Sequence, residues 1–199
     1  NLKACWSREY IAWASSIDLG QPQANRTLKL YLEDVSRLTE RARQVKAECL
    51  ELSETPRYKP YVDALCRLKG VDRMLALLFV ARSVSSYFGL VPARHDSGEK
   101  TGRTGKITKA GDSLVRKAVV EGLSGIANFN GGPKALPKGC VVSNAVEIEA
   151  SRCNQRNVSR YKALVKAGKK ANVAKIAVAK ELVRQMWILG CMVYKKLTS

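Results

Sequence analysis

The chain has 199 residues, and its 35 Lys and Arg against 17 Asp and Glu give a formal net charge of +18. Hydrophobic residues make up 46%, a globular fraction that excludes wholesale disorder. No apolar run approaches the roughly 18 residues of a membrane-spanning helix, and no signal peptide opens the chain. The six scattered cysteines include no Cys-x-x-Cys pair, which excludes a zinc ribbon and a disulfide framework and predicts reduced thiols. So basic a chain is expected to bind polyanions, and nucleic acid is the first candidate.

Residues 1–24 are predicted to form an N-terminal helical connector, because Trp6, Tyr10 and Trp13 are spaced like one helix face. Residues 25–58 are predicted to form a coiled coil, which Pro56 and Pro60 end. Apolar positions there step alternately by three and four residues, which is the a/d pattern of a heptad repeat. An amphipathic helix packed on its own domain is the alternative, but the regularity favours pairing with another helix or chain, giving a dimer. The positions are Leu28, Tyr31, Val35, Leu38, Ala42, Val45, Cys49 and Leu52.

Residues 59–199 are predicted to form a compact helical domain. Near its start, Gly70 and Val71 separate two apolar stretches, in the manner of a helix-hairpin-helix. In that motif a glycine turn lets backbone N–H groups approach a phosphate. A purely structural pair of helices with a glycine turn fits the same residues equally well.

Residues 93–112 are rich in Gly, Lys, Arg, Ser and Thr, and Ile107 is the apolar anchor. We expect a flexible, phosphate-seeking loop that leads into a helix capped near Asp112 or Ser113. His95 is the sole histidine of the chain and is followed directly by Asp96 and Ser97. Adjacent residues point in different directions, which argues against a hydrolase triad. The acids show no clustered pattern that would indicate a self-contained two-metal site.

What remains in this segment is a serine, Ser97, among basic residues. A serine hydroxyl can attack a DNA phosphodiester, and cations nearby would stabilise the charge that develops in the transition state. Residue type alone does not distinguish Ser97 from an ordinary loop serine. The basic residues within reach in the sequence are Arg94, Lys100, Arg103, Lys106 and Lys109.

The segment from Arg152 to Lys180 is the most basic part of the chain and contains no acid. We expect it to bind nucleic acid through Arg152, Arg156, Arg160, Lys162, Lys166, Lys169, Lys170 and Lys175, with Lys180 at its end. The last helix is predicted to turn one broad apolar face into the core. That face comprises Val173, Ile176, Ala177, Val183, Trp187 and Cys191.

Two motifs together resemble one family of insertion-sequence transposases. They are Tyr-Phe-Gly-Leu-Val-Pro followed by Ser97-Gly98, and then Gly-Lys-Ile-Thr-Lys-Ala-Gly-Asp ending at Asp112. The family includes bridge-RNA-guided recombinases and Piv-type DNA invertases. Its members pair an N-terminal RuvC-like carboxylate domain with a C-terminal domain that carries a catalytic serine. The order of motifs is similar over most of this chain, and the family's helical Arg matches Arg116.

The resemblance implies that Ser97 is the nucleophile that links covalently to DNA. The candidates for binding the phosphate or its transition state are the five basic residues Arg94, Lys100, Arg103, Lys106 and Lys109, and the resemblance adds Arg116 to them. It further implies a non-coding guide RNA as a partner. Mg²⁺ would be bound in the full-length enzyme by the RuvC-like domain, and no cofactor is expected in this chain itself.

Three departures from the family pattern stand out. The carboxylate domain is absent from this chain, which begins at Asn1 rather than Met. Asp112 stands where the family has Asn. Between Ala81 and Arg82 the family carries a further stretch of about ten residues, so we expect either a true deletion or an omitted loop at this joint.

The sequence therefore predicts a mainly α protein with a coiled-coil helix and a compact helical transposase domain. Its predicted function is part of a cytoplasmic bacterial DNA recombinase, nucleoid-associated when bound to DNA and inactive without its RuvC-like domain. Transposition and site-specific inversion remain equally compatible with these residues. The alternative from another class is a non-catalytic helical module that binds RNA or DNA.

Overall fold

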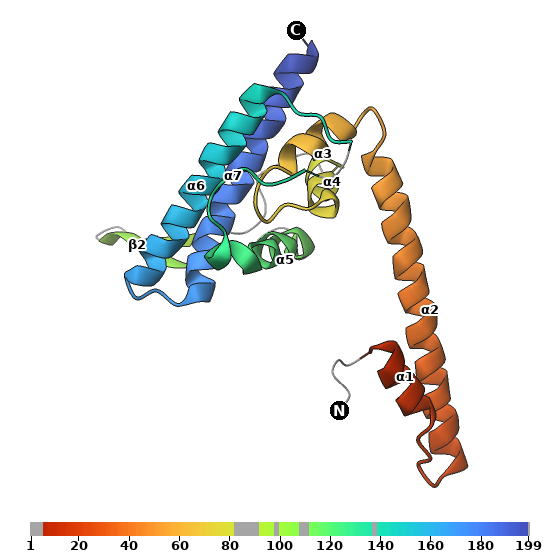
Figure 1. The fold of residues 1–199 in the computed structure, drawn as a ribbon. Helices are drawn as coiled ribbons and strands as arrows, with labels where there is room; N and C mark the ends of the chain where they lie inside the picture. Colours follow the sequence, from red (N-terminus) through yellow and green to blue (C-terminus); the bar gives the residue numbers. More distant parts are fainter. Residues whose placement is uncertain (1–5, 82–91, 98–99, 108–111, 137–138, 199) are drawn as a thin grey trace. The chain divides into compact units, whose positions relative to one another are not determined.

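The structure is a computed structural model, and it describes residues 6–81, 92–97, 100–107, 112–136 and 139–198, with residues 92–97 and 100–107 described through their backbone. The chain divides into two compact units, residues 1–49 and residues 50–199 (Figure 1). The described residues are mainly helical, which confirms the predicted fold class. No described helix combines the length and apolar character needed to cross a membrane.

The first unit contains α1 (Arg8–Ser15) and most of α2 (Pro22–Ser53). Ser7 caps α1 by accepting a hydrogen bond from the Tyr10 backbone N–H at 3.1 Å. The connection to α2 is closed by Asp18 and Asn25, because the Asn25 side-chain amide donates to Asp18 Oδ1 at 2.7 Å. Ala14 on α1 and Leu32 on α2 are buried, so the two helices share a small apolar core.

The heptad segment is one continuous helix, as predicted, since α2 spans all of residues 28–52. Its a/d positions are largely open to solvent within this chain. Tyr31 is 68% exposed, Leu38 is 59% exposed and Val45 is 41% exposed. The helix ends at Ser53, before Pro56.

The second unit is built on a pair of long helices, α6 (Asn144–Lys166) and α7 (Ala171–Thr198), which lie side by side (Figure 1). Against α7 pack the short helix α3 (Lys59–Leu65) and α5 (Ser113–Gly122), and α4 (Arg73–Ala81) packs on both of these short helices. A 3₁₀ helix, η1 (Leu123–Asn128), follows α5 directly. A two-stranded hairpin of β1 (Pro92–Ser97) and β2 (Lys100–Ile107) completes the described elements.

The core face of α7 differs from the predicted one. Val173 is 53% exposed and Trp187 is 49% exposed. The residues that are buried lie on a neighbouring stripe of the helix, because α3, α5 and α6 all approach α7 from that side. This buried stripe comprises Ala174, Val178, Leu182, Met186, Leu189 and Val193.

A reciprocal amide pair lies within the packing of α6 against α7. Asn157 Nδ2 donates to Gln185 Oε1 at 2.7 Å, and Gln185 Nε2 donates to Asn157 Oδ1 at 3.1 Å. Both side chains are buried. Because only one axial alignment of the two helices lets both bonds form, the pair fixes their register.

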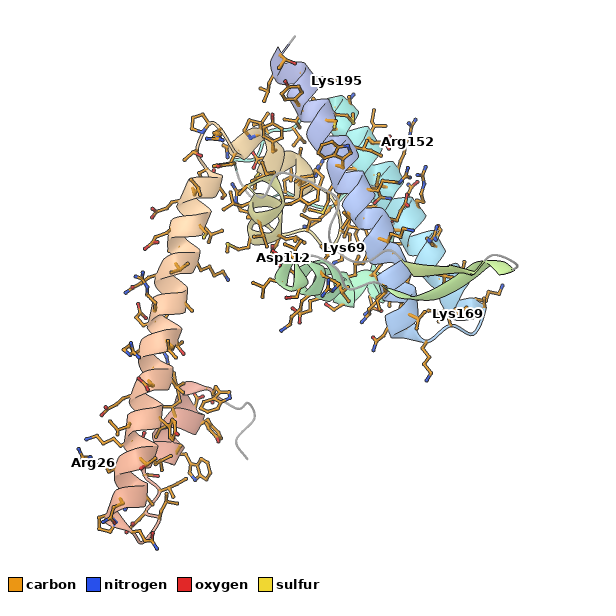
Figure 2. The ribbon with its side chains drawn as sticks, turned by 180° about the vertical axis from the view of Figure 1, so that it is seen from behind. Arg26, Lys69, Asp112, Arg152, Lys169 and Lys195 are labelled. Atoms are coloured by element: carbon orange, nitrogen blue, oxygen red, sulfur yellow. The ribbon has the colours of Figure 1, made fainter. Side chains whose placement is uncertain are left out.

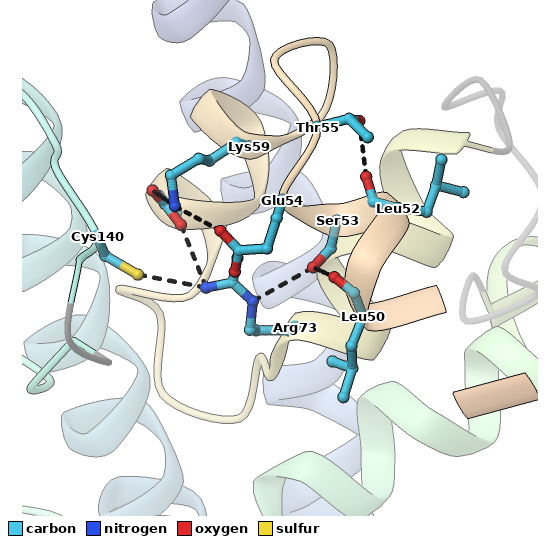
Figure 3. Close-up of polar contacts among 9 residues, drawn as sticks. Leu50, Leu52, Ser53, Glu54, Thr55, Lys59, Arg73 and Cys140 are labelled. Carbon is cyan, nitrogen blue, oxygen red and sulfur yellow. Dashed lines mark hydrogen bonds and ion pairs between the residues drawn. The ribbon is translucent and has the colours of Figure 1, made fainter. Parts of the chain in front are cut away.

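Arg73, at the start of α4, gathers side chains from three parts of the second unit (Figure 3). Its guanidinium donates to Ser53 Oγ at 3.3 Å, to Asp63 Oδ1 at 3.4 Å and to Cys140 Sγ at 3.3 Å, and it forms an ion pair with Glu54. Asp63 is buried and also lies 3.5 Å from Lys59 Nζ. The charge of the buried carboxylate is thus compensated by two cations. The network also connects the loop at Cys140 to α3 and α4.

Candidate functional site

Ser97 is the last residue of β1, directly before the connection to β2. In the antiparallel register Ser97 pairs with Lys100, His95 with Arg103, and Arg94 with Thr104. Of the sequence-predicted cations, Lys100 is therefore the one whose backbone lies directly opposite Ser97. Lys106 lies further along β2, and Lys109 falls outside the described residues.

The predicted flexible loop over residues 93–112 is thus wrong for most of its length, because residues 92–97 and 100–107 pair as antiparallel strands. The register slips twice, and at each slip β2 advances by one residue more than β1. Gly105 lies in the slip opposite Pro92 to Arg94, and Gly102 lies in the slip opposite His95 to Ser97. Glycine is suited to such bulges, where the backbone bends and no side chain is required. The glycines spaced among Thr and Lys residues are the sequence signal for this hairpin.

The helix after the hairpin begins as predicted. Asp112 is the N-cap of α5, and its Oδ1 accepts hydrogen bonds from the backbone N–H groups of Leu114 at 2.8 Å and Val115 at 3.3 Å. Because Asn is as good an N-cap as Asp, this departure from the family pattern leaves the helix start intact. Arg116 follows within the first turn of α5 and is partly exposed.

Backbone groups of the Gly-Val turn between α3 and α4 form hydrogen bonds with other groups of the protein. The Lys69 backbone N–H donates to Asn154 Oδ1 at 2.7 Å, and the Val71 N–H donates to the Leu68 carbonyl at 3.2 Å. The Lys134 ammonium donates to the Leu68 carbonyl at 3.4 Å and to the Val71 carbonyl at 2.5 Å. Burial lowers the pKa of Lys134. These N–H groups are engaged inside the protein, which favours the structural interpretation of the turn over the phosphate-binding one.

The basic C-terminal segment lies on α6, on the connection at residues 167–170 and on the first half of α7. Figure 2 shows Arg152 on α6 and Lys169 at the connection, with their side chains extending away from the helix pair. Gly168 turns the chain here with a φ of 80°. All the predicted nucleic-acid-binding residues from Arg152 to Lys170 are exposed, and Lys175 is half-buried.

The joint between Ala81 and Arg82 lies at the edge of the described part of the chain. α4 ends at Ala81, and residues 82–91 lie outside the described residues. The expectation of a deletion or an omitted loop at this joint therefore stays a prediction. Among the described residues, no three His, Cys, Asp or Glu side chains gather in a way that could hold a metal ion.

Residues 63–135 match the model of the Transposase IS116/IS110/IS902 family. This stretch runs from α3 through the hairpin to the loop after η1. The chain is also 30% identical, over 201 aligned residues, to a protein of Sinorhizobium fredii that carries the name "Putative transposase y4qE". The alignment covers 94% of this chain and 48% of that protein, so the chain spans about half the length of this relative. No solved structure shows a significant match to the chain.

Proposed function

We propose that this chain is the coiled-coil and transposase part of a DNA recombinase, and that Ser97 is its nucleophile. The observation that carries the proposal is the placement of Ser97 inside residues 63–135, which match a transposase family. Ser97 is the last residue of β1, and its partner in the antiparallel register is Lys100 on β2.

In the proposed reaction the Ser97 hydroxyl oxygen attacks a phosphorus atom of the DNA backbone. A bond forms between the serine oxygen and phosphorus, and the bond from phosphorus to one deoxyribose oxygen breaks. The proton lost by the hydroxyl is balanced by one that the departing oxygen takes up. Attack by a deoxyribose hydroxyl of a second strand reverses the step and rejoins the DNA without loss of bond energy.

The hairpin offers the cations that such a step requires. His95 and Ser97 both lie on β1. Their cross-strand partners are Arg103 and Lys100. Because its backbone pairs directly with that of Ser97, Lys100 is our first candidate for stabilising the transition-state charge, with Arg103 and Arg94 after it.

Three partners complete the proposal. Mg²⁺ would be held by a RuvC-like carboxylate domain outside this chain and would supply charge neutralisation at the phosphate. A guide RNA would select the DNA sites. A second copy of the chain would cover the exposed a/d positions of α2, because a recombinase must hold two DNA sites at once. The assembly would act in the bacterial cytoplasm, on the nucleoid.

The test is a trapping experiment with the full-length protein that includes this chain. Donor DNA with a nick beside the cleavage site should leave a covalent DNA–protein adduct, and peptide mapping should place it at Ser97. Ser97→Ala should abolish the adduct and strand exchange while DNA binding persists. Ser124→Ala, an exposed serine of η1 in the same family-matched stretch, is the matched control and should retain activity. Full recombination by Ser97→Ala would refute the nucleophile and favour the non-catalytic nucleic-acid-binding alternative.

A further inference from the structure

The C-terminal part of the chain contains one acid among many bases. From Arg152 to Ser199 the sequence has twelve Lys and Arg residues, and Glu181 is its sole Asp or Glu. A generic polyanion-binding surface gains nothing from a carboxylate at its centre, since the negative charge opposes the ligand. The position of Glu181 in the structure explains why a carboxylate stands there.

Glu181 joins guanidinium groups from two helices. On its own helix, α7, Arg184 Nη2 donates to Glu181 Oε1 at 2.6 Å. From α6, Arg156 Nη1 lies 3.8 Å from the same oxygen. The Glu181 side chain is 19% exposed, whereas both arginine side chains are 59% exposed. The carboxylate therefore lies beneath the arginines and holds one edge of each guanidinium toward the protein.

A third arginine completes the group. Arg160 stands one helical turn after Arg156 on α6 and is exposed. The pKa of Glu181 lies below its usual value, chiefly because of the hydrogen bond from Arg184 and further because of the charges of Arg184, Arg156 and Arg160. All three cations thus act on one carboxylate, and the cluster keeps a net charge of +2.

We propose that Arg156, Arg160 and Arg184 form a clamp for a backbone phosphate of duplex DNA and that Glu181 is its positioning residue. The inference rests on the proposed function and extends it to a residue, Arg184, outside the predicted basic segment. Each guanidinium has five N–H donors in a planar fork. A contact with Glu181 on one edge leaves the other donors free to bind phosphate oxygens in a bidentate manner.

Two substitutions separate a built clamp from a diffuse basic patch. Glu181→Ala removes a negative charge, so a diffuse patch should bind DNA more tightly, whereas a clamp loses the acceptor that orients it. Arg184→Lys keeps the charge but loses the planar fork. The DNA affinity of a diffuse patch should therefore be unaffected, whereas the DNA affinity of a clamp should fall. Asp34 and Arg37 on α2 form an ion pair at 3.0 Å and, like Glu181 and Arg184, are three residues apart. The matched controls are therefore Asp34→Ala and Arg37→Lys.

The measurement is the affinity of this chain for a short labelled DNA duplex over a series of salt concentrations. We expect Glu181→Ala and Arg184→Lys each to weaken binding by roughly threefold, and Arg184→Gln by roughly fivefold. Arg184→Gln should also reduce the slope of log affinity against log salt by about 0.9, the value for one phosphate. The control variants should bind like the wild type, and thermal unfolding should report an intact fold for every variant.

Tighter binding by Glu181→Ala, or unchanged binding by Arg184→Lys, would overturn the clamp while leaving the chain a DNA-binding protein. Failure of the wild-type chain to bind duplex DNA would overturn the DNA-binding part of the proposed function and the clamp with it. Absence of a Ser97 adduct in the trapping experiment would overturn the chemistry alone. The three failures are therefore distinguishable.

Discussion

Gly70 and Gly122 approach so closely that a β-carbon built on Gly122 would lie 2.0 Å from the Gly70 carbonyl oxygen. Gly70 forms the turn before α4 with a φ of 94°, and Gly122 ends α5. The backbone of the turn thus rests directly on the end of α5, where any side chain would separate the two. This contact joins the start of the family-matched stretch to the helix that follows the Ser97 hairpin.

Gly122→Ala should therefore destabilise the second unit by about 3 kcal/mol or more, since the obstructing atoms are backbone and cannot rotate away. Urea unfolding followed by circular dichroism would measure this loss. Gly125→Ala is the matched control, because its β-carbon would meet only the end of the Lys69 side chain at 3.6 Å. Equal stability of the two variants would contradict the close approach.

The amide pair between α6 and α7 predicts a non-additive mutational cycle. Asn157→Leu leaves the buried Gln185 amide without its partner and should cost about 2 kcal/mol, and Gln185→Leu should do the same. The double variant leaves neither amide unsatisfied. Its loss of unfolding free energy should therefore be smaller than the sum of the losses of the two single variants. Thermal or urea unfolding of the four proteins gives the coupling energy, and simple additivity would disprove the reciprocal bond.

The Arg73 network predicts that α4 anchors the buried carboxylate of Asp63. Arg73→Met should cost about 3 kcal/mol, because removing one partner leaves a buried charge poorly compensated. Cys140→Ala removes only a weak sulfur acceptor and should cost less than about 1 kcal/mol. Urea unfolding measures both losses, and a Cys140→Ala variant as unstable as Arg73→Met would show that the loop contact, rather than Asp63, dominates.

The cap of α5 predicts a graded response at Asp112. Asp112→Asn keeps an acceptor for the Leu114 and Val115 N–H groups and should leave stability near that of the wild type. Asp112→Ala should cost about 1 kcal/mol. Unfolding curves of the two variants test the cap, and a destabilised Asp112→Asn would mean that the negative charge matters more than the hydrogen bonds.

The buried thiols predict slow labelling in the native state. Burial raises the pKa of both Cys66 and Cys153 to about 11, above the ordinary 9.0. Iodoacetamide reacts with the thiolate, so the half-buried Cys49 and Cys191 should be modified before Cys66 and Cys153 at pH 8, as peptide mapping would show. Because the folded pKa values exceed the unfolded ones, the stability these thiols contribute is complete below pH 9 and is lost as the pH rises toward about 11.

Those features that depend on residues close together in the chain could be predicted from the sequence. The spacing of Leu28, Val35 and Leu38 predicted a continuous helix, and α2 is one, because helical periodicity is a local property. Asp112 was identified as a possible cap for the same reason. Ser97 stood out through short motifs, and residues 63–135 match a transposase family, whereas the chemistry of the serine stays a proposal.

Features that require distant segments to meet were decided only by the tertiary structure. Residues 92–97 and 100–107 pair as strands although their sequence predicts a loop, because the strands satisfy each other's backbone groups without an apolar pattern. The buried face of α7 was misplaced, because apolar residues such as Val173 and Val178 surround the helix and only the approach of α3, α5 and α6 selects one stripe. Composition showed a basic C-terminal part, but the convergence of Arg156 and Arg184 on Glu181 exists only once α6 and α7 pack together.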